Sequence, residues 1–205
     1  MKIRIELSEE EIVLNRKKAS QRKLCFAARA ELSSADRAEK SRRISENLLE
    51  LLQNLPEIVP GTTILTYAAF ADEADPGLCL QALREMGFRI AYPAIMPGRQ
   101  MLALVPFDEN EMKPDRFGIP TPDPARAETV LPEEISAIIV PCVGFDRSGR
   151  RLGHGAGYYD RFLVRCPKAP CLLVAFAAQE LPEIATGPYD LPMDYIVTET
   201  MKMSI

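Results

Sequence analysis

The sequence predicts an α/β fold, in which three layers place helices on both faces of a largely parallel sheet. Two patterns lead to this prediction. Long runs of helical composition, at residues 9–32 and 34–54, precede short β-branched runs that have the length of buried strands. The chain has 205 residues and 47% apolar content, which is enough for one good core. We therefore expect a single domain over residues 1–205.

The first helix is expected to begin after Ser8, because Ser8 followed by Glu11 forms a capping box. The run that follows contains neither glycine nor proline. On this helix Lys18, Arg22 and Arg29 are spaced by four and seven residues, so they lie close to one face. Taken from the residues alone, a basic stripe of this kind is a solvated surface.

A second helix is predicted at residues 34–54, and a buried strand at residues 62–69. Asp75 and Pro76 then indicate the N-cap and first turn of a helix that ends at Gly87. The apolar residues of the second helix recur at helical spacing and are expected in the core: Ile44, Leu48, Leu51, Leu52 and Leu55.

Two short strands are predicted at residues 89–92 and 101–105, separated by a turn at Pro97 and Gly98. Residues 106–132 contain six prolines, which exclude a long helix and indicate a loop laid across the surface. The remaining predicted strands are apolar runs at residues 137–140, 171–176 and 195–198.

The segment after residue 140 is rich in glycine and charge, and it leads into a helix predicted from Tyr158 to Cys166. It holds five of the eleven glycines, namely Gly144, Gly149, Gly153, Gly155 and Gly157. Glycine lets a ligand approach the main chain closely, so amide groups can converge on phosphate oxygens. A helix N-terminus beside the loop adds further donors.

This pattern favours a nucleotide-phosphate site, with Asp160 available as an oxygen ligand for Mg²⁺. Arg147, Arg150 and Arg151 supply positive charge there. The simpler alternative is a flexible surface loop. The spacing matches neither a P-loop nor a Rossmann fingerprint, so general motifs do not decide between the two.

The whole segment closely resembles the signature of the 5-formyltetrahydrofolate cyclo-ligase family, also called 5,10-methenyltetrahydrofolate synthetase. The matching residues are Pro141, Phe145, Asp146, Gly149, Arg151, Leu152, Gly153, Gly155, Gly157, Tyr158, Tyr159 and Asp160. Weaker matches extend the resemblance over about residues 17 to 199. The resemblance implies the fold of the sugar-phosphate isomerase and CoA-transferase group. It also implies an enzyme that uses MgATP to convert 5-formyltetrahydrofolate to 5,10-methenyltetrahydrofolate, ADP and phosphate through a phosphorylated formyl intermediate.

Site residues follow from the same resemblance, position by position. The implied ATP-binding residues are Lys18, Arg22, Arg151, Gly153, His154, Gly155, Ala156, Gly157, Tyr158 and Asp160, of which Asp160 also holds Mg²⁺. The implied catalytic residues are Arg151, Tyr158 and Tyr159, and the implied folate-binding residues are Tyr67, Phe70, Glu73 and Phe117. Thr121 and Tyr189 depart from the residues commonest in the family, and Ala156 fills a variable position.

Composition limits the other possibilities. The net charge of −4 gives no general attraction to nucleic acid or to an anionic membrane. No apolar run approaches the roughly 18 residues of a spanning helix, and the acidic N-terminus is unlike a targeting peptide. We therefore expect a cytoplasmic enzyme, monomeric or weakly homodimeric, whose partners are its small-molecule substrates.

The five cysteines lack Cys-x-x-Cys spacing and are expected to be reduced core thiols, and a single histidine excludes a histidine-rich metal site. Two alternatives stay open. One is a sugar-phosphate isomerase or hydrolase on the same fold, which would need no ATP. The other is a non-catalytic relative that binds folate or nucleotide.

Overall fold

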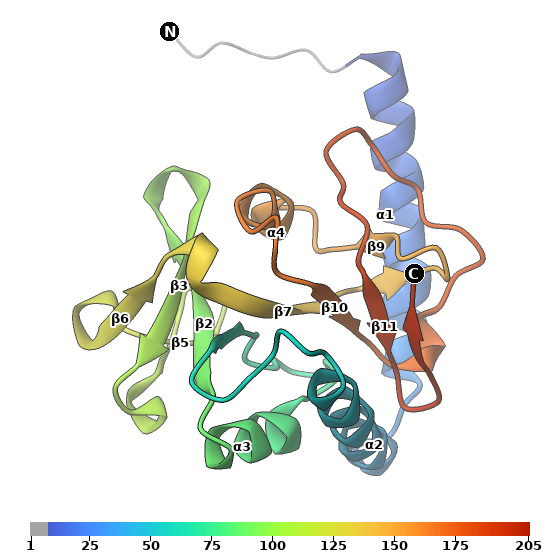
Figure 1. The fold of residues 1–205 in the computed structure, drawn as a ribbon. Coiled ribbons are helices and arrows are strands. Elements are labelled where there is room, and N and C mark those ends of the chain that lie inside the picture. Colours follow the sequence, from blue (N-terminus) through green and yellow to red (C-terminus); the bar gives the residue numbers. More distant parts are fainter. Residues whose placement is uncertain (1–7) are drawn as a thin grey trace, which may run out of the picture.

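The computed structural model describes residues 8–205 of the chain. Within them, eight strands form one sheet in the order β12-β11-β10-β7-β1-β2-β3-β6 (Figure 1). The parallel strands are β11 (Tyr195–Val197), β10 (Cys171–Val174), β7 (Ile135–Pro141), β1 (Thr63–Leu65) and β2 (Arg89–Met96). The antiparallel strands at the edges are β3 (Gln100–Pro106), β6 (Ala127–Val130) and β12 (Lys202–Ser204). The predicted α/β fold with a largely parallel sheet is confirmed.

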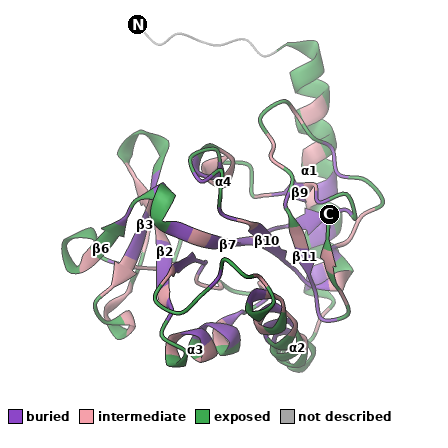
Figure 2. Cartoon of the chain, in the orientation of Figure 1, coloured by how far each residue is buried: buried purple, intermediate pink, exposed green. Residues whose placement is uncertain are grey.

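Helices cover both faces of this sheet. On one face, α2 (Ser34–Gln53) and α3 (Gly77–Glu85) bury their apolar stripes, and on the other face α4 (Tyr158–Leu163) does so. Successive side chains of a strand point to opposite faces of the sheet. In β7, Ala137 and Ile139 pack on the side of α2 and α3, whereas Ile138 and Val140 pack on the side of α4. Figure 2 shows the buried residues, in purple, along the central strands of the sheet.

The long first helix, α1 (Glu9–Ala30), begins as its capping box predicts. The Ser8 hydroxyl accepts from the Glu11 amide at 3.2 Å, and the Glu11 carboxylate accepts from the Ser8 amide at 2.8 Å. Of the predicted core stripe, Ile44, Leu48 and Leu52 are at most 1% exposed, whereas Leu51 and Leu55 are partly buried and pack against the same core.

Several element boundaries differ from the prediction, among them that of β2, which runs to Met96 instead of residue 92. β1 covers Thr63–Leu65 instead of residues 62–69, although residues 66 and 67 remain buried outside the ladder. α4 ends at Leu163 and not at Cys166. Pro76, not Asp75, occupies the N-cap position of α3, and the Asp75 carboxylate accepts from the Gly77 amide at 2.9 Å. The strands β6 and β12 were not expected.

Short elements complete the chain. Two small hairpins pair β4 (Lys113–Pro114) with β5 (Pro120–Thr121) and β8 (Gly144–Phe145) with β9 (Arg151–Leu152). All five cysteines are free and buried, as expected. None of the helices in residues 8–205 has the length and apolar character needed to cross a membrane. The single-domain organisation stays a prediction, and its first seven residues lie outside the described part.

The strand order reverses its direction between β1 and β7. The chain leaves β1 through α3 to reach β2 on one side, whereas β7 is the parallel neighbour of β1 on the other side. The loops that leave these two strands therefore diverge, and ligands of open α/β sheets bind at such switch points. Residues 66–76 and the glycine-rich segment both begin at this edge.

Candidate functional site

Helix α1 packs across the carboxyl ends of the parallel strands with its polar face inward. It contacts β8, which follows β7, and the short helix Ala177–Gln179, which follows β10. The buried residues of α1 are Gln21, Cys25 and Arg29, whereas Val13 and Leu24 are 64% and 58% exposed. The basic stripe is thus part of an interface, and the solvated stripe that the residues alone predicted is wrong.

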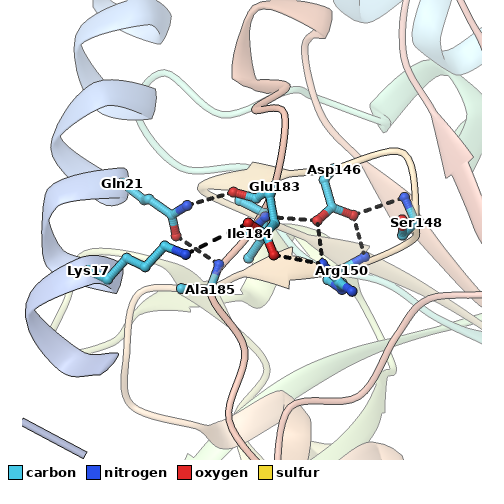
Figure 3. Close-up of polar contacts among 8 residues, drawn as sticks. All are labelled: Lys17, Gln21, Asp146, Ser148, Arg150, Glu183, Ile184 and Ala185. Atoms are coloured by element: carbon cyan, nitrogen blue, oxygen red, sulfur yellow. Dashed lines mark hydrogen bonds and ion pairs between the residues drawn. The ribbon is translucent and has the colours of Figure 1, made fainter. Parts of the chain in front are cut away.

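The glycine-rich segment is anchored by the buried carboxylate of Asp146, which is 2% exposed. Its oxygens accept hydrogen bonds from the amides of Ser148 at 2.9 Å, Arg150 at 3.3 Å and Ile184 at 2.8 Å (Figure 3). An aspartate that bonds the amide two residues later stabilises a turn. Asp146 therefore fixes the start of the glycine loop.

Residues 183–185 join this loop to α1 through the side-chain amide of Gln21. Gln21 donates to the Glu183 carbonyl at 2.6 Å and accepts from the Ala185 amide at 3.0 Å (Figure 3). Lys17 and Arg150 lie 3.8 Å and 3.5 Å from the Glu183 carboxylate. Residues 183–185 therefore fix the position of α1 relative to the glycine loop.

Arg22 reaches the glycine loop directly. Its Nε donates to the Gly153 carbonyl at 2.7 Å. A Cβ on Gly155 would lie 3.2 Å from Nη2 of Arg22, and Gly155 has a φ of +100°, so only glycine suits this position. Lys18, one turn earlier, forms an ion pair with Asp190, whose carboxylate also accepts from the Gly187 amide.

Arg151 is buried beneath the loop. Its Nη2 donates to Oδ1 of Asp160 at 2.8 Å, and its Cζ lies 5.6 Å from the centre of the Tyr159 ring. Within the described chain, Nε of Arg151 and the hydroxyl of Tyr159 are buried without a hydrogen-bond partner. Burial raises the pKa of Tyr159 far above its ordinary value, so the phenol is protonated. Buried polar atoms without partners are uncommon and indicate a ligand or an ordered water.

The loop after β1 carries two carboxylates toward α1. Arg29 pairs through Nη2 with Asp72 at 2.7 Å, and Glu73 accepts from the Phe70 amide at 3.2 Å. Burial raises the pKa of Glu73, and the opposing effects of the Phe70 amide and Arg29 only partly offset this. Tyr67 is 4% exposed and its hydroxyl donates to the Ala74 carbonyl, so it supports the loop from below.

His154 covers this region from the glycine loop. Its ring lies 5.9 Å from the ring of Phe26, in a tilted arrangement. Burial and then the nearby charges of Arg29, Arg22 and Arg151 lower the pKa of His154 below its ordinary value. These surroundings favour the neutral form of the His154 imidazole.

A cleft of about 480 Å³ opens beside the glycine loop. Its walls are Met96, Pro97, Gly98, Arg99, Arg116, Phe117, Gly155, Ala156 and Tyr158. Phe70 lies at the same edge, because a Cβ on Gly118 would be 3.2 Å from its ring. The cleft thus joins the tip of the β2–β3 hairpin, the proline-rich segment and the glycine loop.

The structure brings most of the predicted site residues together at the carboxyl edge of the sheet. Arg22, Arg151 and Asp160 meet at the glycine loop, and Phe117 and Tyr158 line the cleft. Two predicted residues do not line the cleft. Lys18 lies one turn before Arg22 on α1 and pairs with Asp190, and Tyr67 lies in the core.

Sequence reasoning did not assign a role to Arg29 or Arg116. Arg29 belongs to the same helical stripe as Lys18 and Arg22, and this spacing was a usable signal. Arg116 immediately precedes Phe117, but no sequence pattern distinguishes it from the other exposed arginines.

For Mg²⁺, residues 8–205 contain no group of three or more His, Cys, Asp or Glu side chains able to hold a metal ion. Mg²⁺ that accompanies a nucleotide needs only one or two carboxylates, with phosphates and waters as its other ligands. Asp160 fits this requirement, because Arg151 bonds only its Oδ1 and its side chain is 21% exposed.

The sequence and the fold of the chain match those of known proteins. A model of the 5-formyltetrahydrofolate cyclo-ligase family matches residues 14–199. A 5-formyltetrahydrofolate cyclo-ligase of Mycolicibacterium smegmatis is 31% identical over 148 residues, which are 68% of this chain and 75% of that protein.

Two solved structures share the fold. The structure of Aquifex aeolicus 5,10-methenyltetrahydrofolate synthetase superposes with a TM-score of 0.74 and 30% identity, covering 91% of this chain and 92% of that one. The 5,10-methenyltetrahydrofolate synthetase of Mycoplasma pneumoniae superposes with a TM-score of 0.71 over 89% of this chain and 98% of its own, and its 23% identity supports the fold alone.

Proposed function

The chain belongs to the 5-formyltetrahydrofolate cyclo-ligase family, and from this premise we propose that it uses MgATP to convert 5-formyltetrahydrofolate to 5,10-methenyltetrahydrofolate, ADP and phosphate. The observation that carries the proposal is the glycine loop, where Arg22 bonds the Gly153 carbonyl and Arg151 bonds Asp160, beside a buried tyrosine hydroxyl that has no partner among the described residues. Such a site suits an anionic ligand and a neutral carbonyl together.

The chemistry has two steps. The formyl group is amide-like and a poor electrophile, so its oxygen first attacks the γ-phosphorus of ATP and ADP leaves. The amine N10 then attacks the activated carbon and loses its proton, and phosphate leaves as the C–O bond breaks. Phosphoryl transfer depends mainly on positioning and on neutralising charge.

The residues take the following proposed roles. Arg22 and Arg151 neutralise phosphate charge from two sides of the glycine loop, whose amides at residues 153–157 hold the phosphate oxygens. Lys18 adds charge from the next turn of α1. The glycine amides carry more of this binding than the N-terminus of α4, because α4 has only six residues.

On the folate side, Glu73 accepts hydrogen bonds from the pteridine, and Phe70 and Phe117 pack against the substrate. Tyr158 and Tyr159 border the formyl group, and the hydroxyl of Tyr159, which has no partner among the described residues, is a protonated donor for the formyl oxygen. Asp160 holds Mg²⁺, which supplies charge neutralisation at the phosphates when bound. The cytoplasmic location and the monomeric or weakly dimeric state stay predictions.

The stoichiometry of the reaction tests this proposal. We expect one ADP and one phosphate for each methenyl group formed, and no ATP hydrolysis without the folate. ATP hydrolysis that is independent of 5-formyltetrahydrofolate would contradict the coupling. Binding of both ligands without any product would favour a non-catalytic relative, and binding of neither would favour the sugar-phosphate alternative.

A further inference from the structure

Two arginines stand on the walls of the cleft beside the glycine loop. Arg99 lies at the tip of the β2–β3 hairpin, and Arg116 lies in the proline-rich segment. Both side chains belong to exposed residues, and neither takes part in an ion pair in the described part of the chain. In a chain where 29 acidic residues outnumber 25 basic ones, two such arginines on one cleft mark a place for an anion.

The backbone and the neighbouring rings present these two side chains. Arg99 has a φ of +60°, a conformation that few residues other than glycine adopt. The guanidinium of Arg116 lies 4.7 Å from the centre of the Phe117 ring, and its Nη2 lies 3.3 Å from the Tyr158 hydroxyl. Stacking on an aromatic face leaves the N–H groups at the edge of a guanidinium free to bind a carboxylate.

The substrate of the proposed reaction has the matching chemistry. Its reacting amine N10 is bonded to an aromatic benzoyl ring, and this ring carries a glutamate with two carboxylates. A substrate whose formyl group lies beside Tyr158 therefore places its aromatic ring next to that residue and its carboxylates farther along the cleft. Phe117 lines the same cleft and is 54% exposed, so its ring is available for stacking.

We propose that Arg99 and Arg116 bind the glutamate carboxylates of the folate substrate, while Phe117 packs on its benzoyl ring. This inference rests on the proposed function and adds a specificity site to it. An arginine binds a carboxylate with two parallel hydrogen bonds, so two arginines suit the two carboxylates of one glutamate.

ATP is the other source of anionic oxygens, and its proposed contacts at Gly155, Ala156 and Tyr158 reach one wall of the cleft, but the cations proposed to bind it lie elsewhere. Arg22 and Lys18 approach the loop from α1. In Figure 1 the tip of the β2–β3 hairpin lies on the opposite side of α4 from α1. Gly155 lines the cleft, and its Cβ position lies 3.2 Å from Nη2 of Arg22, so this glycine connects the cleft to α1.

The test compares two substrates that differ only in the glutamate. Wild type and the double variant R99Q/R116Q are assayed with 5-formyltetrahydrofolate and with 5-formyltetrahydropteroate, which lacks the glutamate. We expect the double variant to lose about tenfold or more in kcat/KM for the folate, mainly through KM, and to lose much less with the pteroate. Arg43→Gln, at an exposed position of α2 outside the cleft, is the matched control.

Equal losses with both substrates would overturn the proposal, because the arginines would then act on something other than the tail. A raised KM for ATP with an unchanged KM for the folate would assign the arginines to the nucleotide instead. Equilibrium binding of 5-formyltetrahydrofolate without ATP separates this inference from the proposed function. Weaker binding by the double variant supports the cleft assignment even without turnover, whereas equal binding by both proteins contradicts it.

Discussion

Arg22 donates a hydrogen bond from its Nε to the carbonyl oxygen of Gly153 at 2.7 Å, although 131 residues separate them in the chain. This contact couples the first helix to the glycine loop, and it depends on the absence of a side chain at Gly155. The positive charge of α1 is therefore positioned by the backbone of the loop that we propose to hold phosphate.

Gly155→Ala is expected to impair ATP use while leaving the fold intact. The new Cβ would lie 3.2 Å from Nη2 of Arg22 and force this side chain to shift, so KM for ATP should rise. The φ of +100° should also lower the free energy of unfolding by about 1 to 2 kcal/mol. Urea denaturation and steady-state kinetics measure the two effects.

Gly61→Ala is the matched control, because Gly61 has a φ of +91° and nothing within 4 Å of its Cβ position. It should show a similar loss of stability with normal ATP kinetics. If both variants behaved alike in the kinetic assay, the role of Arg22 at the loop would be wrong.

Glu73→Gln is expected to weaken folate affinity while ATP binding is kept, because glutamine accepts fewer hydrogen bonds and carries no charge. Burial raises the pKa of Glu73 above 4.5, so folate affinity of the wild type should fall as pH decreases through that raised value. The variant should lack this pH dependence. Titrating folate binding over pH 4 to 8 tests it, with exposed Glu57→Gln as the control; an unchanged affinity at pH 7 would count against the pteridine contact.

The same pKa shift predicts an effect on stability. A carboxyl group with a raised native pKa binds more protons in the native state than in the unfolded state, so its ionisation destabilises the fold as pH rises through this window. Glu73→Gln should therefore be more stable than the wild type at pH 7, and this difference should shrink below pH 4.5. Thermal unfolding of both proteins at pH 7 and at about pH 4 measures this difference in stability. A variant that is less stable than the wild type at pH 7 would contradict the predicted direction of the effect.

Arg29 and Asp72 are expected to couple strongly, because their side chains are only 6% and 32% exposed. Arg29→Met should destabilise the protein, since it leaves the Asp72 charge without its partner. A double-mutant cycle with Asp72→Asn should give a coupling free energy of about 1 to 3 kcal/mol. The exposed Arg42 and Glu46 pair of α2 should give a much smaller value, and equal values for both pairs would refute the structural role.

Asp160→Asn should lose most Mg²⁺-dependent turnover and remain folded, because asparagine still accepts the hydrogen bond from Arg151. Turnover measured against Mg²⁺ concentration at saturating ATP should reach a much lower maximum and need more Mg²⁺ for half of it, because a neutral amide binds this cation less tightly than a carboxylate does. Near-normal activity with normal Mg²⁺ dependence would remove Asp160 from the metal site.

The parallel core of the fold follows from local pattern, whereas its edges do not. The strand was expected at residues 62–69 but ends at Leu65. The prediction was too long because hydropathy alone cannot distinguish a buried strand from the buried loop that follows it. Strand β6 was not predicted because prolines lie on both sides of it in the sequence. These prolines flank Ala127–Val130 without interrupting it, and a strand at the edge of a sheet tolerates them. Strand β12 has three residues and forms only by pairing with β11.

The candidate site was predicted in its parts but not in its connections. The glycine loop and the basic stripe are visible in the sequence because each is local. The partners of that stripe, Gly153, Asp190 and Asp72, are tertiary contacts that no spacing rule supplies. The burial of Arg29 and the cleft beside Arg116 likewise appear only when distant segments are brought together.

The most direct test of the account is the ultraviolet absorbance of the purified protein with 5-formyltetrahydrofolate and MgATP, compared with a parallel sample that lacks ATP. We expect methenyltetrahydrofolate to accumulate only in the sample with ATP. No methenyltetrahydrofolate in either sample, or equal accumulation in both, would contradict it.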